Sequence, residues 1–206
     1  MKIGLNIGAG TGESNYLFSD FNIVHCFEPN TFSFDILKKL DNNNLVLHNY
    51  GISDIDGYKK FNNFDGFSYS SLLDLDTASE FYKHCTQVDE GFDGYMFKTD
   101  IEVKRLDTFI KENNLTNISL IKIDTQGHDL NVVRSLGDCI NIVDTIVLEC
   151  QLKPLYKNSH TKEEIILYMN NNNFNLINTE KNYTTNIENC NVSFEENLTF
   201  KNNKNL

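Results

Sequence analysis

Short apolar runs alternate with helical patterns along almost the whole chain. The apolar runs have the length of β-strands, and the segments between them carry apolar residues at helical spacing. This alternation predicts an α/β fold, with a mostly parallel sheet that is covered by helices on both faces. The predicted strands span 3–7, 23–27, 45–52, 119–123, 145–150, 174–178 and 192–200, and the predicted helices span 31–40, 106–113, 129–136 and 162–169.

The segment 65–100 departs from this alternation because it is rich in glycine and aromatic residues. The run 58–64 before it follows a turn at Asp56-Gly57, and we expect it to return as a hairpin. An insertion of this length without its own secondary structure is uncommon in a compact domain unless it is functional. Since 206 residues suffice for one ordinary domain, we expect a single domain over 1–206 with a mobile insert at about 65–100.

The stretch "LNIGAGTGES" places Gly8, Gly10 and Gly12 directly after the first predicted strand. Glycines allow a tight turn and let a ligand approach the backbone closely. A dinucleotide fingerprint requires its third glycine one position later, where this chain has Glu13, whose carboxylate would repel a pyrophosphate. Glu28 ends the second predicted strand, where an acid can accept hydrogen bonds from ribose hydroxyls. The combination favours S-adenosylmethionine, a nucleoside cofactor with a sulfonium and no phosphate.

These motifs belong to a series whose order resembles that of the FkbM-type methyltransferases. The blocks are "LNIGAGTGES", "CFEPN", "HNYGISD", "RLDTFI", "LIKIDTQGHDLNVVRS" and "VLECQ", and the resemblance covers nearly all of residues 2–200. It implies a Rossmann-like class I methyltransferase fold with a seven-stranded sheet of order 3-2-1-4-5-7-6. It also implies S-adenosyl-L-methionine as cofactor and a hydroxyl oxygen of a sugar, glycan or small metabolite as acceptor. The implied cofactor-binding residues are Asn6, Gly8, Gly10, Gly12, Glu28, Asn30, Gly51 and Ile52.

The stretch "IKIDTQGHDL" ends a predicted strand in a cluster of polar side chains, and Glu149 ends the next one. Ligands of open α/β sheets bind outside such strand ends. An imidazole with a pKa of about 6.5 suits a general base, so we expect His128 to take the acceptor proton. We expect Asp124 to orient it or the acceptor, and Gln126, where the family has glutamate, to hydrogen-bond the acceptor. Glu149 either faces the acceptor or is structural, and Asp129 favours a helix N-terminus. Asp124 could instead bind a divalent metal, although a single acid supplies few of the ligands that such a metal requires.

The formal charge of −11 and the pI of about 4.8 make nucleic acid a poor default partner, because a phosphate backbone would be repelled. Two alternatives stay open, a nucleic-acid methyltransferase on the same fold and a non-catalytic module that binds S-adenosylmethionine. The five cysteines form no C-x-x-C pair, which favours free thiols in a reducing compartment. With no apolar run of about 18 residues and no leader pattern, we expect a cytoplasmic protein.

Overall fold

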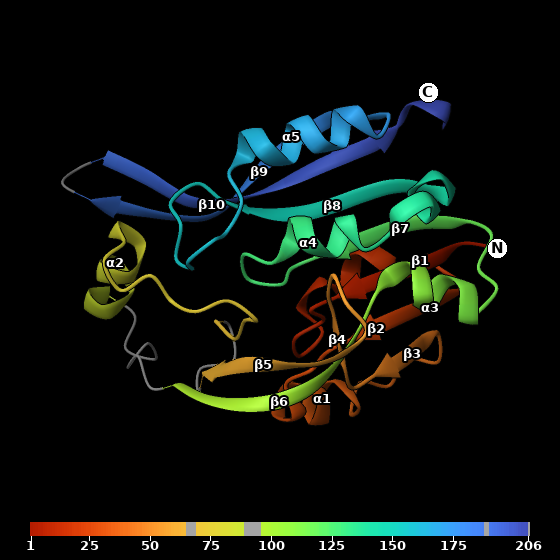
Figure 1. The fold of residues 1–206 in the computed structure, drawn as a ribbon, viewed down its shortest axis with the longest axis horizontal. Coiled ribbons are helices and arrows are strands. Elements are labelled where there is room, and N and C mark those ends of the chain that lie inside the picture. Colours follow the sequence, from red (N-terminus) through yellow and green to blue (C-terminus); the bar gives the residue numbers. More distant parts are fainter. Residues whose placement is uncertain (65–68, 89–95, 188–189, 206) are drawn as a thin grey trace.

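A seven-stranded sheet forms the centre of the computed structural model, which describes residues 1–64, 69–88, 96–187 and 190–205 (Figure 1). Its strands are β1 (Ile3–Ile7), β2 (Ile23–Phe27), β3 (Leu45–His48), β7 (Ile118–Ile123), β8 (Val143–Gln151), β9 (Phe174–Ile187) and β10 (Cys190–Asn202). The spatial order is β3-β2-β1-β7-β8-β10-β9.

This order differs from the expected numbering when strands are counted along the whole chain, because β4, β5 and β6 form a separate sheet. Counted within the seven-stranded sheet alone, it reads 3-2-1-4-5-7-6. Neighbouring strands from β3 to β8 run parallel, whereas β10 is antiparallel to both β8 and β9. The sheet is therefore mixed, with an antiparallel hairpin at one edge.

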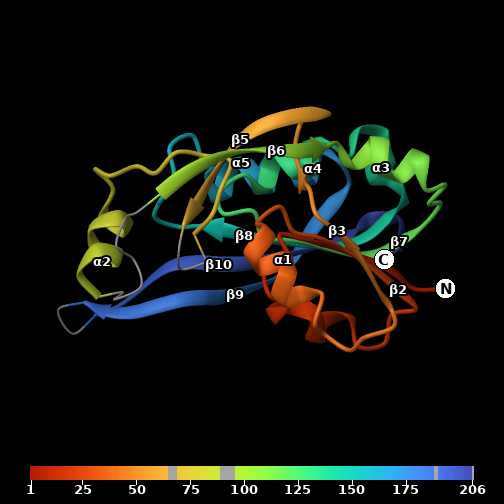
Figure 2. The same ribbon diagram turned by 90° about the horizontal axis from the view of Figure 1, so that it is seen from below.

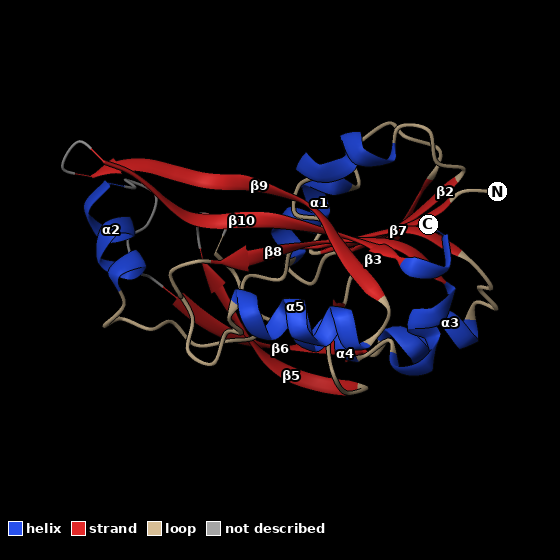
Figure 3. Ribbon diagram, turned by 90° about the horizontal axis from the view of Figure 1, so that it is seen from above, coloured by secondary structure: helices blue, strands red, loops and turns tan. Residues whose placement is uncertain are grey.

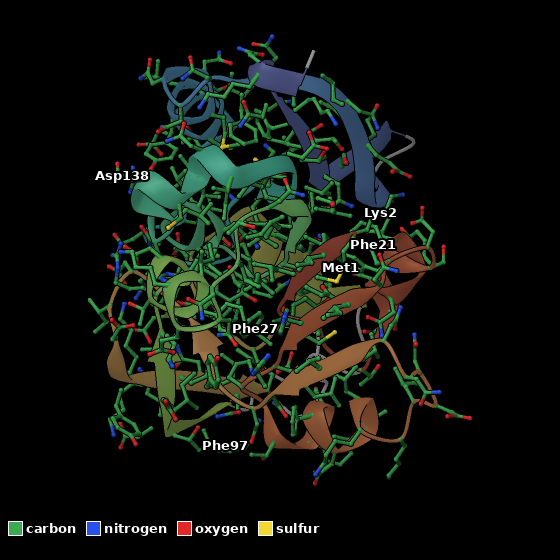
Figure 4. The ribbon with its side chains drawn as sticks, turned by 90° about the vertical axis from the view of Figure 1, so that its right-hand side faces the viewer. Met1, Lys2, Phe21, Phe27, Phe97 and Asp138 are labelled. Carbon is green, nitrogen blue, oxygen red and sulfur yellow. The ribbon has the colours of Figure 1, made fainter. Side chains whose placement is uncertain are left out.

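Helices cover both faces of this sheet (Figure 3). On one face α1 (Thr31–Leu37) and the 3-10 helix η1 (Glu13–Phe18) pack over Val24 and Cys26 of β2. On the other face α3 (Leu106–Glu112), α4 (Asp129–Arg134) and α5 (Lys162–Asn171) bury the main apolar core. Successive strand residues point to opposite faces, so β2 also contributes Phe27 to that second core, where Figure 4 shows it in the interior.

A second, smaller sheet contains β4 (Gly51–Ile52), β5 (Gly57–Phe64) and β6 (Met96–Lys104) in the order β4-β6-β5. The expected hairpin return of 58–64 is wrong, because β5 pairs antiparallel with β6, which lies more than thirty positions further along the chain. The expected strand over 45–52 is divided, since β3 stays in the large sheet while β4 pairs with β6.

Part of the expected insert forms regular secondary structure. Helix α2 (Glu80–Val88) lies beside the far end of the β9–β10 hairpin (Figures 1 and 2). Phe81 of this helix stacks on Phe194 of β10, with ring centroids 4.6 Å apart. Residues 65–68 and 89–95 of the expected insert lie outside the described residues. In the described part of the chain, no helix is both long and apolar enough to cross a membrane.

Candidate functional site

A cavity of about 430 Å³ opens at the carboxyl ends of β1, β2 and β7. One part of its wall is the glycine turn and the end of β2, and a second part comes from β7, β8 and β10. The third part comes from the small sheet and the segment around α2. The lining residues include Gly8, Gly10, Thr11, Glu13, Ser14, Glu28, Pro29, Ser33, Gly51, Ile52, Phe61, Tyr69, Leu72, Phe81, Ile101, Asp124, Gln126, Glu149 and Glu195.

The glycine turn lies directly against the end of β7. The backbone N–H of Asp124 donates to the Ile7 carbonyl oxygen at 2.9 Å. Gly8 has φ +72, and a Cβ at this position would lie 1.9 Å from the carbonyl oxygen of Asp124. Gly10 also has a left-handed backbone, with φ +55, and a Cβ there would require the Glu13 carboxylate, 2.7 Å away, to move. The wall here is bare backbone, which a ligand can approach closely.

Gly12, the third glycine predicted to bind the cofactor, has a structural role instead. Gly12 is the N-cap of η1 with φ +107. A Cβ there would meet the side chains of Leu40 and Asn15, and the residue does not line the cavity. Gly12 therefore shapes the turn without facing a ligand.

The carboxylate of Glu28 joins two loops at the cavity wall. Its Oε2 accepts from the Gly10 N–H at 2.8 Å, and its Oε1 accepts from the Asn30 N–H at 2.7 Å. Burial raises the pKa of Glu28 to about 7, although both hydrogen bonds lower it, and the charges of Asp124 and Glu13 raise it further. Each oxygen keeps a second lone pair, so the side chain can still accept from hydroxyls of a ligand.

Gln126 bridges two acids at the second part of the wall. Its Nε2 donates to Asp124 Oδ1 at 2.9 Å and to Glu149 Oε2 at 3.0 Å. The residue has a left-handed backbone with φ +52, and its carbonyl oxygen accepts from Ser71 Oγ at 2.7 Å. The amide therefore holds Asp124 and Glu149 side by side on the cavity wall, rather than pointing free toward an acceptor.

Burial is the main reason that the pKa of Glu149 lies well above its usual range, and the nearby charges of Asp124 and Glu195 add to it. Burial likewise raises the pKa of Glu195 to about 7. Sequence reasoning missed Glu195, because only the antiparallel return of β10 places it opposite Gln151 of β8. Its surroundings, "VSFEENLTF", carry no motif that would mark it.

His128 lies outside the cavity, which corrects the expectation that it faces the acceptor. Its ring is buried, with Nε2 3.0 Å from Ser53 Oγ and Nδ1 3.2 Å from Asn131 Nδ2. Burial lowers the pKa of His128 to about 4, so the imidazole is a weaker base than the one we expected. Nε2 therefore links the start of α4 to the residue after β4, and Nδ1 contacts α4 itself.

Two further polar residues of the predicted site, Asn30 and Asn6, brace the loops instead of lining the cavity, and Asp129 lies at the N-terminus of α4 as expected. Asn30 caps α1 with its side chain, which accepts from the N–H groups of Phe32 and Ser33. Asn6 is fully buried and donates to Asn15 Oδ1 at 3.2 Å. The carboxylate of Asp129 accepts from the backbone N–H groups of Thr125 and Gly127 at 3.1 and 3.0 Å, so it holds the loop before α4.

The sheet order, the glycine turn and the acid at the end of β2 define the class as an S-adenosylmethionine-dependent methyltransferase. A family model described as Methyltransferase FkbM domain matches residues 3–176, and the chain belongs to this family. The cofactor is S-adenosyl-L-methionine. The bare backbone at Gly8 and Gly10 and the free lone pairs of Glu28 fit a nucleoside with a sulfonium.

Solved structures with similar folds are distant in sequence. An rRNA methylase from Streptococcus thermophilus is 8% identical with a TM-score of 0.51, over 98% of this chain and 87% of that chain. Magnesium protoporphyrin IX methyltransferase from Synechocystis PCC 6803 with bound SAM is 10% identical with a TM-score of 0.50, over 97% and 69%. Identities this low show a shared fold alone. No curated protein sequence matches the chain.

Proposed function

We propose that this methyltransferase methylates a hydroxyl oxygen of a sugar, a glycan or another small polyhydroxy metabolite. The observation that carries the proposal is the pair of acids, Asp124 and Glu149, that Gln126 bridges at the cavity wall. A hydroxyl becomes a good nucleophile as it loses its proton, and an adjacent carboxylate can accept that proton. Because burial raises the pKa of Glu149, its carboxylate is a stronger base than an exposed one.

The glycine turn and Glu28 would hold the cofactor. When bound, S-adenosyl-L-methionine supplies an electrophilic methyl group on its sulfonium. Gly8 and Gly10 leave room for it at the backbone, and Glu28 accepts from ribose hydroxyls. Glu13, Glu28 and Asp124 surround this end of the cavity with carboxylates, which suit a cationic ligand.

The third part of the wall suits an acceptor with apolar faces and hydroxyl groups. Phe61, Tyr69 and Phe81 line it, and aromatic rings pack well against the C–H faces of sugars. Among the described residues that line the cavity there is no lysine or arginine, so a phosphate-rich acceptor would find no counter-charge. These features favour a neutral polyol.

The proposal is tested by transfer of labelled methyl from S-adenosylmethionine to a panel of glycosides, other polyols, amines and nucleic acids. We expect label in an ether that resists base, formed on a hydroxyl compound. Asp124→Asn removes a proton acceptor and should lower turnover by about 10²-fold or more, the usual contribution of a positioned base. Asp138→Asn, an exposed site on the 3-10 helix Gly137–Ile142, is the matched control and should keep full turnover.

Other products would contradict the proposal. Label on nitrogen or carbon would leave the methyltransferase family intact and refute oxygen as the acceptor atom. Binding of S-adenosylhomocysteine without turnover on any acceptor would favour a module that binds the cofactor and does not catalyse.

A further inference from the structure

Tyr156 contacts Gln126, the residue that bridges the two acids, and has no part in the proposed proton transfer. Its side chain is fully buried. The hydroxyl lies 3.1 Å from Gln126 Oε1 and 2.7 Å from the carbonyl oxygen of Tyr69, which lines the cavity. Both neighbours are acceptors, so the single hydroxyl proton is shared between the amide and the cavity wall.

The orientation of the Gln126 amide decides whether Asp124 and Glu149 face a hydrogen-bond donor or an acceptor. An amide presents either its NH₂ group or its oxygen to a neighbour, and a half-turn exchanges the two. Nε2 must face both carboxylates to hold them as a pair. Once Glu149 has taken a proton, its O–H would favour the reversed amide, with Oε1 toward the acid. The Tyr156 hydroxyl, which also donates to the Tyr69 carbonyl oxygen, opposes that reversal while its proton is directed at Oε1.

We infer that Tyr156 is a positioning residue, whose hydroxyl keeps the Gln126 amide directed at both carboxylates and ties it to the cavity wall at Tyr69. The inference rests on the proposed function, in which this acid pair accepts the proton. Burial raises the pKa of Tyr156 well above 10, so the phenol stays a donor at any pH at which the enzyme works. Nothing in the sequence around Tyr156 marked it as part of the site.

The charged groups around Glu149 set the direction of the effect. They are Asp124 and Lys122 of β7, Glu195 of β10 and Asp129 of α4. The three acids raise the pKa of Glu149 and Lys122 lowers it, and removing the Tyr156 hydroxyl changes none of them. Hydrogen bonds to an ionised carboxylate lower its pKa. Loss of the Nε2 donor should therefore raise the pKa of Glu149 further.

Tyr156→Phe tests this, because it removes the hydroxyl and keeps the ring. With the protein saturated with S-adenosylhomocysteine, the side-chain carboxyl of Glu149 is titrated by carbon-13 NMR. We expect its midpoint to rise in Tyr156→Phe and to stay unchanged in Tyr168→Phe, a half-buried tyrosine on α5. Turnover on a hydroxyl acceptor should fall about tenfold, the value of one hydrogen bond, with the acceptor KM and the cofactor affinity unchanged.

Gln126→Met provides a second variant that leaves Tyr156 in the core. It removes the amide and should raise the Glu149 midpoint by itself, and adding Tyr156→Phe to it should then have no further effect. Equal midpoints in wild type and Tyr156→Phe would overturn the inference. If Tyr156→Phe does not fold, an unshifted midpoint in Gln126→Met does the same. The titration needs no acceptor, so a failure of the proposed hydroxyl chemistry would be seen separately.

Discussion

Glu28 is a buried acid, and burial raises its pKa to about 7, so it titrates near neutral pH. Its ionised form accepts hydrogen bonds more strongly than its protonated form. We therefore expect the affinity for S-adenosylhomocysteine to rise about tenfold from pH 5.5 to pH 8, as Glu28 loses its proton. Calorimetry at a series of pH values measures this.

Two variants assign that pH dependence to one residue. Glu28→Gln should flatten it and leave the affinity low at pH 8, whereas Glu13→Gln, on the same wall, should keep the step. An affinity that does not change with pH in the wild type would mean that Glu28 does not bind the cofactor.

The roles within "IKIDTQGHDL" show what single residues reveal before a structure is known. The acid at position 124 could be placed, because it directly follows a buried strand. The bridging position of Gln126 and the buried position of His128 away from the cavity could not be predicted. Gln126 and Gly127 are both left-handed, with φ of +52 and +87, and this pair of residues turns the chain so that His128 faces Ser53 instead of the cavity. A glycine signals a positive φ, whereas a glutamine gives no such sign.

Among the elements, α2 is joined to the cavity and to the β9–β10 hairpin by one side chain. Phe81 is buried, stacks on Phe194 and lines the cavity. Phe81→Ala should lower the free energy of unfolding by about 3 kcal/mol or more, because a large ring leaves a void. Thermal denaturation should show a midpoint lower by roughly 6–12 °C.

The matched control for this prediction is Phe97→Ala on β6. Phe97 is 45% exposed and lies at the outer rim of the small sheet (Figure 4), so its loss should change stability by less than about 1 kcal/mol. The affinity for S-adenosylhomocysteine should stay within about twofold in both variants, since neither ring belongs to the glycine turn. Equal midpoints for Phe81→Ala and wild type would show that α2 is not anchored by this ring.

The strands differ in how clearly their sequences predict them. β1 and β2 match the predicted 3–7 and 23–27, because strands buried on both faces are near-continuous apolar runs. β6 was missed although "DIEVK" alternates charged and apolar residues, which is the pattern of a strand exposed on one face. Its partner β5 precedes it by a long excursion of the chain, and such long-range pairing leaves no local signature.

At the scale of the whole molecule, the cavity is assembled from segments that are far apart in the sequence. The glycine turn comes from the first residues of the chain, the small sheet from its first half, and Glu195 from its last strand. The location of the cavity at the carboxyl ends of the strands is expected for any open α/β sheet. The walls that enclose the cavity could not be predicted, because they depend on pairing of β5, β6 and β10 with strands far away in the sequence.

The charge of the whole chain bears on the rival acceptor. Eighteen lysines and arginines face twenty-nine acids, for a formal charge of −11. Binding to nucleic acid is driven by neutralisation of phosphates by cationic side chains. The described residues around the cavity include the acids Glu13 and Asp124 and no lysine or arginine. Both the overall field and the local field therefore repel a phosphate backbone.

We accordingly expect no labelled methyl in RNA or DNA under conditions in which a neutral polyol is methylated, and no binding to total RNA at about 0.15 M salt. Filter binding and a methyl-transfer assay with RNA as acceptor measure the two. Lowering the salt should not rescue binding, because reduced screening strengthens the repulsion between two anions. The proposal of a hydroxyl acceptor would be refuted if RNA bound the protein, if added salt weakened that binding, and if labelled methyl accumulated on the RNA bases. It would also require a cationic surface away from the cavity, since the described residues that line the cavity offer none.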